Sequence, residues 1–112
     1  MNGRKKIGIM GGTFDPVHIA HLILAENAYR TFCLDSVMML PSGHPAYKRG
    51  GGRTITPAEH RLAMLEEACR DIPYFCVSDM EIRREGNTYS SDTLAILLEE
   101  NPDTDYYFII GG

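Results

Sequence analysis

The chain has 112 residues, of which 44% are hydrophobic and 23% charged, and its formal net charge is −4 at pH 7. This length and composition predict one modest globular domain over residues 1–112. The acidic balance argues weakly against nucleic acid as the main partner, since such binding usually needs a basic face. No run approaches the roughly 20 apolar residues that a membrane-spanning helix requires, so we expect no membrane association.

The three cysteines bear on the cellular compartment. Cys33, Cys69 and Cys76 are odd in number, widely spaced and set among apolar neighbours, which is not typical of a disulfide framework or a zinc site. We therefore expect buried free thiols in a reducing compartment. The apolar run near the amino terminus, Ile7 to Met10, is too short for the core of a signal peptide. Together these features predict a cytoplasmic protein.

The first half of the chain predicts two strands, one helix and a long loop. Lys5 to Met10 has the apolar run of a short buried strand. A helix is expected from about Pro16 to Phe32, with Asp15 as its N-cap and proline at its first position. Ser36 to Leu40 is a second apolar run of strand length. Residues 41–56 show no periodicity and contain three consecutive glycines, so they form a loop that is long for a compact domain.

The second half predicts a helix, a strand, another helix and a last strand. Thr56 to Glu59 has the pattern of a capping box, with proline at the first helical position. Tyr74 to Val77 is the third strand, residues 90–101 form a helix that ends before Pro102, and residues 105–112 include the fourth strand. Alternating strands and helices predict an α/β fold with a Rossmann-like, doubly wound parallel sheet.

The loops that follow the four strands are expected to share one edge of that sheet. They cover residues 11–21, 41–53, 78–91 and 111–112. In open parallel sheets, ligands bind beyond the carboxyl ends of the strands. The sequence therefore predicts a single ligand site built from these four segments.

The stretch "GGTFDPVHIAHL" carries the chemistry of that site. Gly11 and Gly12 allow the backbone to approach a bulky anion, and the helix that follows directs its free N–H groups and positive dipole end to the same place. His18 and His21 share one face of the first helical turns and could donate hydrogen bonds to phosphoryl oxygens as negative charge builds on them. This pattern favours phosphoryl or nucleotidyl transfer.

Other interpretations of the two histidines stay open at this point. They could form part of a metal site, although no third ligand is obvious nearby, or they could be ordinary surface or core residues. A dinucleotide-binding fingerprint fits poorly, because the third glycine is absent and no acidic residue closes the second strand.

The same stretch resembles the signature of the HxGH nucleotidyltransferase superfamily, and most closely that of the nicotinate-nucleotide adenylyltransferases. Further segments are similar to that family: "MLPSGHPAYK", "AEHRLAMLEEA", "NTYSSDTL" and "YYFIIGG". The resemblance implies transfer of an adenylyl group from ATP to nicotinate mononucleotide, with Mg²⁺ accompanying ATP. It implies catalytic roles for His18 and His21, contacts to ATP and its phosphates from Gly11, Gly12, Thr13, Phe14, Lys48 and Gly111, and contacts to nicotinate mononucleotide from Thr88 and Tyr89.

The sequence departs from the family pattern in three respects. Ala20 stands where the family usually has glycine, and Tyr47 stands where it has a histidine before the loop lysine. The family also runs longer and carries a later Ser-Ser/Thr-x-x-Arg phosphate motif, so we expect a chain truncated at its carboxyl terminus. The alternatives are another acceptor, such as nicotinamide mononucleotide or phosphopantetheine, and a nucleotide-binding module without activity. A homo-oligomer is compatible with the sequence.

Overall fold

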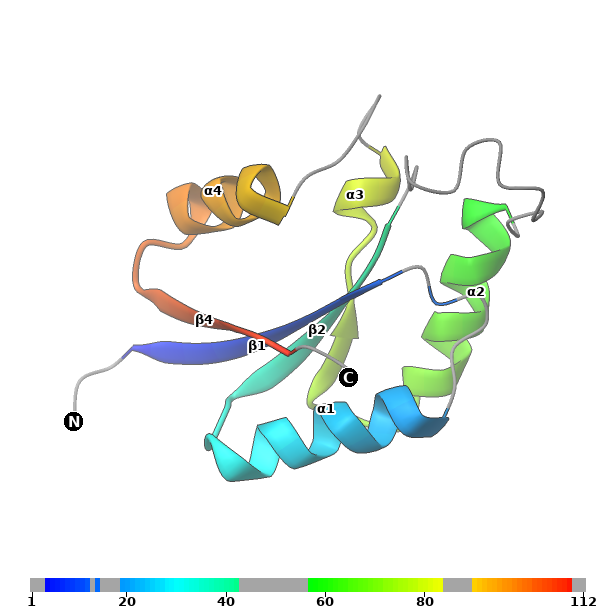
Figure 1. Cartoon of the computed structure of the whole chain (residues 1–112), viewed down its shortest axis with the longest axis horizontal. Helices are drawn as coiled ribbons and strands as arrows, with labels where there is room; N and C mark the ends of the chain where they lie inside the picture. The colour runs from blue at the N-terminus through cyan, green and yellow to red at the C-terminus, as the bar shows by residue number, and fades with distance from the viewer. Residues whose placement is uncertain (1–3, 13, 15–18, 43–56, 84–89, 110–112) are drawn as a thin grey trace.

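The computed structural model describes residues 4–12, 14, 19–42, 57–83 and 90–109 (Figure 1). Strands and helices alternate along the chain, except that two helices precede the last strand. In chain order the elements are β1 (Lys5–Gly12), α1 (Ile19–Thr31), β2 (Ser36–Pro41), α2 (Ala58–Cys69), β3 (Phe75–Val77), α3 (Met80–Arg83), α4 (Ser90–Glu100) and β4 (Thr104–Phe108).

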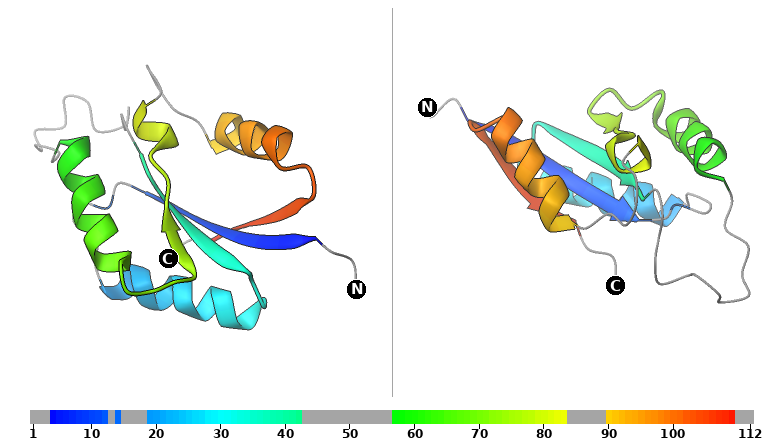
Figure 2. Two further views of the ribbon diagram at one scale, coloured as in Figure 1. Left: turned by 180° about the vertical axis from the view of Figure 1, so that it is seen from behind. Right: turned by 90° about the horizontal axis from the view of Figure 1, so that it is seen from above.

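The four strands form one parallel sheet in the order β3-β2-β1-β4. The chain moves in one direction from β1 to β3 and then returns to place β4 on the other side of β1. Right-handed crossovers consequently put α1 and α2 against one face of the sheet and α4 against the other (Figures 1 and 2). The predicted doubly wound α/β fold is confirmed, and the strand order reverses at β1, between β2 and β4.

Side chains alternate between two apolar clusters, one on each face of the sheet. Along β2, Val37 and Met39 point to the cluster under α1 and α2, whereas Met38 and Leu40 point to the cluster under α4. The first cluster contains the buried residues Met10, Phe14, Ala25, Leu34, Val37, Met39, Leu65, Cys69 and Phe75, and the second contains Ile9, Leu40 and Leu97. Both faces are covered, which explains why the strands are apolar runs without polar alternation.

Several element boundaries differ from those expected. β1 continues to Gly12 instead of ending at Met10, because its last two residues still pair with the end of β2. α2 begins at Ala58, with Pro57 as an N-cap that makes no side-chain capping bond. Thr56, the expected cap, lies outside the described residues. The four-residue helix α3 was not expected; the Met80 N–H at its start donates to the Ser78 hydroxyl oxygen over 3.3 Å.

The expectation of buried cysteines is wrong for two of the three. Cys69 is buried in the cluster under α2, but Cys33 and Cys76 are exposed. Cys33 lies in the turn after α1, at a φ of 53°. Cys76 lies on β3, the edge strand, and points away from the face that Phe75 and Val77 share with the first cluster.

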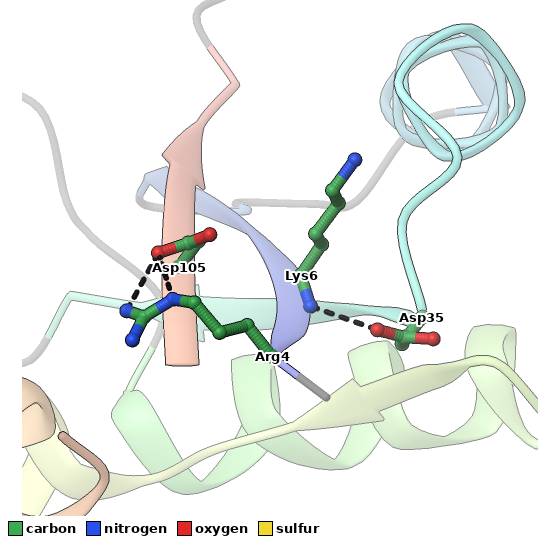
Figure 3. Close-up of polar contacts among 4 residues, drawn as sticks. All are labelled: Arg4, Lys6, Asp35 and Asp105. Atoms are coloured by element: carbon green, nitrogen blue, oxygen red, sulfur yellow. Dashed lines mark hydrogen bonds and ion pairs between the residues drawn. The ribbon is translucent and has the colours of Figure 1, made fainter. Parts of the chain in front are cut away.

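Polar contacts fasten the amino ends of the strands (Figure 3). The Arg4 side chain donates from Nε and Nη2 to Asp105 Oδ1, over 2.9 and 2.7 Å. The Lys6 N–H donates to Asp35 Oδ2 over 2.8 Å, and the Asp35 N–H donates back to the Lys6 carbonyl over 2.7 Å. The hydrogen bond from Arg4 holds the pKa of Asp105 below its ordinary value. These contacts tie β4 and the α1–β2 turn to the start of β1.

Gly8 allows close packing at the centre of β1. A Cβ atom at this position would lie 2.8 Å from Leu34 Cδ1 and 3.0 Å from Ile109 Cδ1. Both distances are shorter than ordinary carbon contacts, so a larger residue would have to displace these side chains. The glycine thus lets Leu34 and Ile109, which both belong to the first cluster, pack closely against the strand.

Candidate functional site

The carboxyl ends of the strands meet at one edge of the sheet. The Ser42 N–H, just after β2, donates to the Gly12 carbonyl at the end of β1 over 2.8 Å. The Ser78 N–H, just after β3, donates to the Met39 carbonyl over 2.9 Å, and the Ile109 N–H, just after β4, donates to the Ile9 carbonyl over 2.9 Å. The strand ends that lead into the predicted site therefore converge. The predicted site lies where the strand order reverses, which is where such sheets bind ligands.

Gly11 and Gly12 form the exposed end of β1. Gly12 has a φ of 156°, a conformation that residues with a Cβ atom rarely adopt. The nearest described atom to a Cβ placed on Gly11 is the Leu40 carbonyl oxygen at 3.8 Å, and on Gly12 it is Phe14 Cε2 at 3.9 Å. Among the described residues, nothing crowds this backbone, so an anion could approach it closely.

Phe14 lies in the core, two residues after the end of β1. Its side chain is only 3% exposed and belongs to the cluster under α1 and α2. Its φ is 51°, the left-handed region that bulky residues seldom occupy. Strained backbone of this kind persists where the surroundings enforce it, and it gathers at ligand sites. The buried ring thus anchors the chain just after β1, while Gly11 and Gly12 stay exposed.

His21 is held by that ring. It lies in the first turn of α1, is half-buried, and meets Phe14 edge to face, with ring centroids 5.0 Å apart and an interplanar angle of 64°. An aromatic contact of this geometry restricts the rotation of the imidazole. The structure thus brings together Gly11, Gly12, Phe14 and His21. The other predicted site residues, Thr13, His18, Lys48, Thr88, Tyr89 and Gly111, lie outside the described residues.

Two buried polar contacts near this edge were missed by sequence reasoning. Arg61, in the first turn of α2, is 2% exposed and donates from Nη1 to the Ser42 carbonyl over 2.7 Å. Arg61 precedes the buried Leu65 and Cys69 at intervals of four residues, so its place on the apolar face of α2 was detectable from helical spacing.

The second missed contact joins α3 to α4. The Thr93 hydroxyl donates to Glu81 Oε2 over 2.7 Å, and the two residues are 2% and 8% exposed. They flank the segment 84–89, which includes the predicted acceptor residues Thr88 and Tyr89. No periodicity in the surrounding polar stretch pointed to a buried carboxylate here.

Within the described residues, no group of three or more histidine, cysteine, aspartate or glutamate side chains could hold a metal ion. The described helices also include none that is both long and apolar enough to cross a membrane.

Comparison with known proteins identifies relatives of this chain. The family model described as "Cytidylyltransferase-like" matches residues 9–112. The chain is 54% identical over 108 residues to a probable nicotinate-nucleotide adenylyltransferase of Lachnoclostridium phytofermentans, covering 96% of this chain and 53% of the relative. A probable nicotinate-nucleotide adenylyltransferase of Bacillus cytotoxicus is 49% identical over 108 residues, covering 96% of this chain and 56% of the relative. The chain spans about half the length of these curated relatives.

Solved structures agree on the fold. The nicotinic acid mononucleotide adenylyltransferase of Plasmodium falciparum, complexed with NaAD, superposes with a TM-score of 0.79 at 21% identity. The match covers 93% of this chain and 50% of that protein. The same enzyme complexed with APC gives a TM-score of 0.75 at 21% identity and covers 93% of this chain and 49% of that protein.

Proposed function

Because this chain belongs to the cytidylyltransferase-like family, we propose that residues 1–112 form the N-terminal portion of a single nucleotidyltransferase domain that serves adenylyl transfer. The substrates are ATP and nicotinate mononucleotide, and the products are deamido-NAD and pyrophosphate. The observation that carries this proposal is the juxtaposition of the exposed Gly11–Gly12 backbone with the Phe14-anchored imidazole of His21, at the reversal point of the sheet.

In this function the Gly11–Gly12 backbone, together with the predicted turn that follows it, receives the phosphates of ATP; we call this segment the glycine turn. Backbone N–H groups at the turn and at the start of α1 would bind phosphoryl oxygens, aided by the positive end of the helix. His21 would donate a hydrogen bond to oxygens on the α-phosphorus, and His18 stays a predicted second catalytic donor. A ring already held by Phe14 loses little freedom when it binds, so its interaction with the growing charge is preorganised.

The reaction is an in-line displacement at the α-phosphorus of ATP. A phosphate oxygen of nicotinate mononucleotide forms the new bond to phosphorus, while the bond from the α-phosphorus to the oxygen shared with the β-phosphate breaks and its electron pair leaves with pyrophosphate. The attacking phosphate is already ionised near neutral pH, so the protein need not supply a strong base. Orientation and charge stabilisation account for the catalysis.

Mg²⁺ is expected to accompany ATP. The described residues offer no carboxylate cluster that fits the ion, so we assign no step to it and expect the phosphate oxygens to carry it. Lys48, Gly111 and Thr13 stay predicted nucleotide contacts, and Thr88 and Tyr89 stay predicted acceptor contacts. A cytoplasmic location and a homo-oligomer likewise stay predictions.

A pyrophosphate-release assay tests the proposal. The protein is supplied with ATP, Mg²⁺ and one of three acceptors: nicotinate mononucleotide, nicotinamide mononucleotide or phosphopantetheine. We expect the first to be the preferred acceptor, and His21→Ala to lower turnover by about 10²-fold or more through loss of a transition-state donor. His60→Ala is the matched control, because His60 is an exposed histidine on α2.

Each other result redirects the assignment. Preference for another acceptor would keep the reaction and change its substrate. ATP binding by calorimetry without pyrophosphate release would favour a nucleotide-binding module. Equal turnover in the parent and His21→Ala would contradict the proposed role of the histidine.

A further inference from the structure

We propose that Arg61 is a positioning residue for the glycine turn that would receive the ATP phosphates, an inference that rests on the proposed function. Arg61 is the largest fully buried side chain of the described residues, at 2% exposure. A buried cation costs several kcal/mol unless its donors are satisfied, so a structural reason for its position is required. The structure supplies one at the carboxyl edge of the sheet.

The guanidinium group acts on that edge through the backbone. Arg61 Nη1 donates to the Ser42 carbonyl over 2.7 Å, and the Ser42 N–H donates to the Gly12 carbonyl over 2.8 Å. Two hydrogen bonds and a single residue thus connect α2 to Gly12, which ends β1 with a φ of 156°. The first bond is charge-assisted and part-buried, so it is stronger than a bond between neutral groups.

The hydrogen bond to Ser42 explains why an arginine lies on the apolar face of α2. Ser42 is the first residue beyond β2, where the ladder between β1 and β2 ends. Without a contact from α2, the Ser42–Gly12 hydrogen bond would be the terminal bond of the ladder, and terminal bonds open most easily. The hydrogen bond from Arg61 fixes the Ser42 peptide; we call this contact the clamp. Ser42 in turn binds the Gly12 carbonyl and begins the segment that carries Lys48. Arg61 also has at least one further interaction, so removing it disturbs more than one bond.

Amide hydrogen exchange tests this role without depending on enzyme activity. In Arg61→Met, which retains an apolar stem, we expect the Ser42 amide to exchange about tenfold faster or more, because a charge-assisted bond is lost. The amides of Val37 and Ile109, which donate to Tyr74 and Ile9, report on strand pairs other than the Ser42–Gly12 pair. If Arg61 had only a structural role, its replacement would accelerate exchange of all three amides together. If it is a positioning residue, its replacement accelerates exchange of the Ser42 amide selectively.

Conservative and control variants sharpen the test. Arg61→Lys restores one donor and a charge, so it should recover part of the Ser42 protection and should fold even if Arg61→Met does not. Arg70→Met is the matched control, because Arg70 is exposed at the end of the same helix and pairs only with the exposed Glu67 in the described contacts. It should leave Ser42 exchange unchanged.

ATP affinity, measured by calorimetry, completes the experiment. We expect Arg61→Met to weaken ATP binding by about tenfold and Arg61→Lys to weaken it less, in the order of their Ser42 exchange rates. If the parent protein binds no ATP, the proposed function fails, while selective exchange at Ser42 still supports the clamp. If Ser42 exchange rises only in step with Val37 and Ile109, or if ATP affinity is unchanged in a variant with fast Ser42 exchange, the positioning role is overturned.

Discussion

The ring contact between Phe14 and His21 should appear as a measurable coupling between the two side chains. Phe14→Leu keeps an apolar side chain of similar bulk in the cluster under α1 but removes the ring. Since Phe14 is 3% exposed, the imperfect fit should cost about 1–1.5 kcal/mol in the free energy of unfolding. Loss of the edge-to-face contact should add about 0.5–1.5 kcal/mol. The variant should remain folded, because domains of this size unfold with about 5–15 kcal/mol.

A double-mutant cycle isolates the second contribution. Urea unfolding of the parent, Phe14→Leu, His21→Ala and the double variant gives four free energies of unfolding from the linear extrapolation. The double variant should be less destabilised than the sum of the two single variants, by about 0.5–1.5 kcal/mol, because the ring contact can be lost only once. The dependence of the free energy on urea concentration should be the same for all four proteins.

A second cycle replaces His21→Ala by His60→Ala and serves as the control. His60 is exposed on α2, so its removal should be additive with Phe14→Leu within about 0.3–0.5 kcal/mol. Additivity in both cycles would refute the view that Phe14 holds the imidazole. The geometry of His21 would then have to come from α1 alone.

Three further predictions concern the rest of the described fold. Gly8→Ala should lower the free energy of unfolding by about 1 kcal/mol, since the new Cβ atom meets side-chain atoms at 2.8 and 3.0 Å; thermal unfolding measures the loss. Thr93→Val should cost about 1–3 kcal/mol in urea unfolding, because the buried Glu81 carboxylate loses its donor, and Thr93→Ser should recover most of it. Asp105 has a folded-state pKa lowered by Arg4, so its stabilising contribution is complete above the unfolded pKa and is lost as pH falls through the lowered folded pKa. Asp105→Asn should therefore flatten the acid side of a plot of the urea midpoint against pH, and an unchanged plot would contradict this assignment.

The sequence was sufficient to predict the fold because its signals are local. Each strand is an apolar run bounded by polar or glycine residues, and each long helix has apolar positions at helical spacing. The alternation of the two then limits the topology to a parallel sheet with right-handed crossovers. The two glycines at the strand end and the place of His21 in the first helical turn followed from one contiguous stretch of the sequence.

The features that the sequence did not predict depend on contacts between segments that are distant along the chain. Arg61 and Ser42 are 19 residues apart, and Glu81 and Thr93 are 12 apart, so neither pairing leaves a local pattern. The exposure of Cys76 depends on β3 being an edge strand, which is a property of strand order and not of the residue. The extension of β1 to Gly12 likewise depends on its partner β2, since glycine alone argues against continuing a strand.

The place of β1 between β2 and β4 has a consequence for synthesis of the chain on the ribosome. Its partner on one side is complete at Pro41, but its partner on the other side begins only at Thr104, 63 residues later. At a translation rate of about 5–20 residues per second, one side of β1 therefore stays unpaired for roughly 3–13 s. An unpaired apolar strand invites pairing with other nascent chains. Arg4 and Lys6 place positive charge at the start of β1, which opposes such pairing. Once Asp105 has been synthesised, Arg4 forms its ion pair with Asp105 and so helps to hold β4 beside β1.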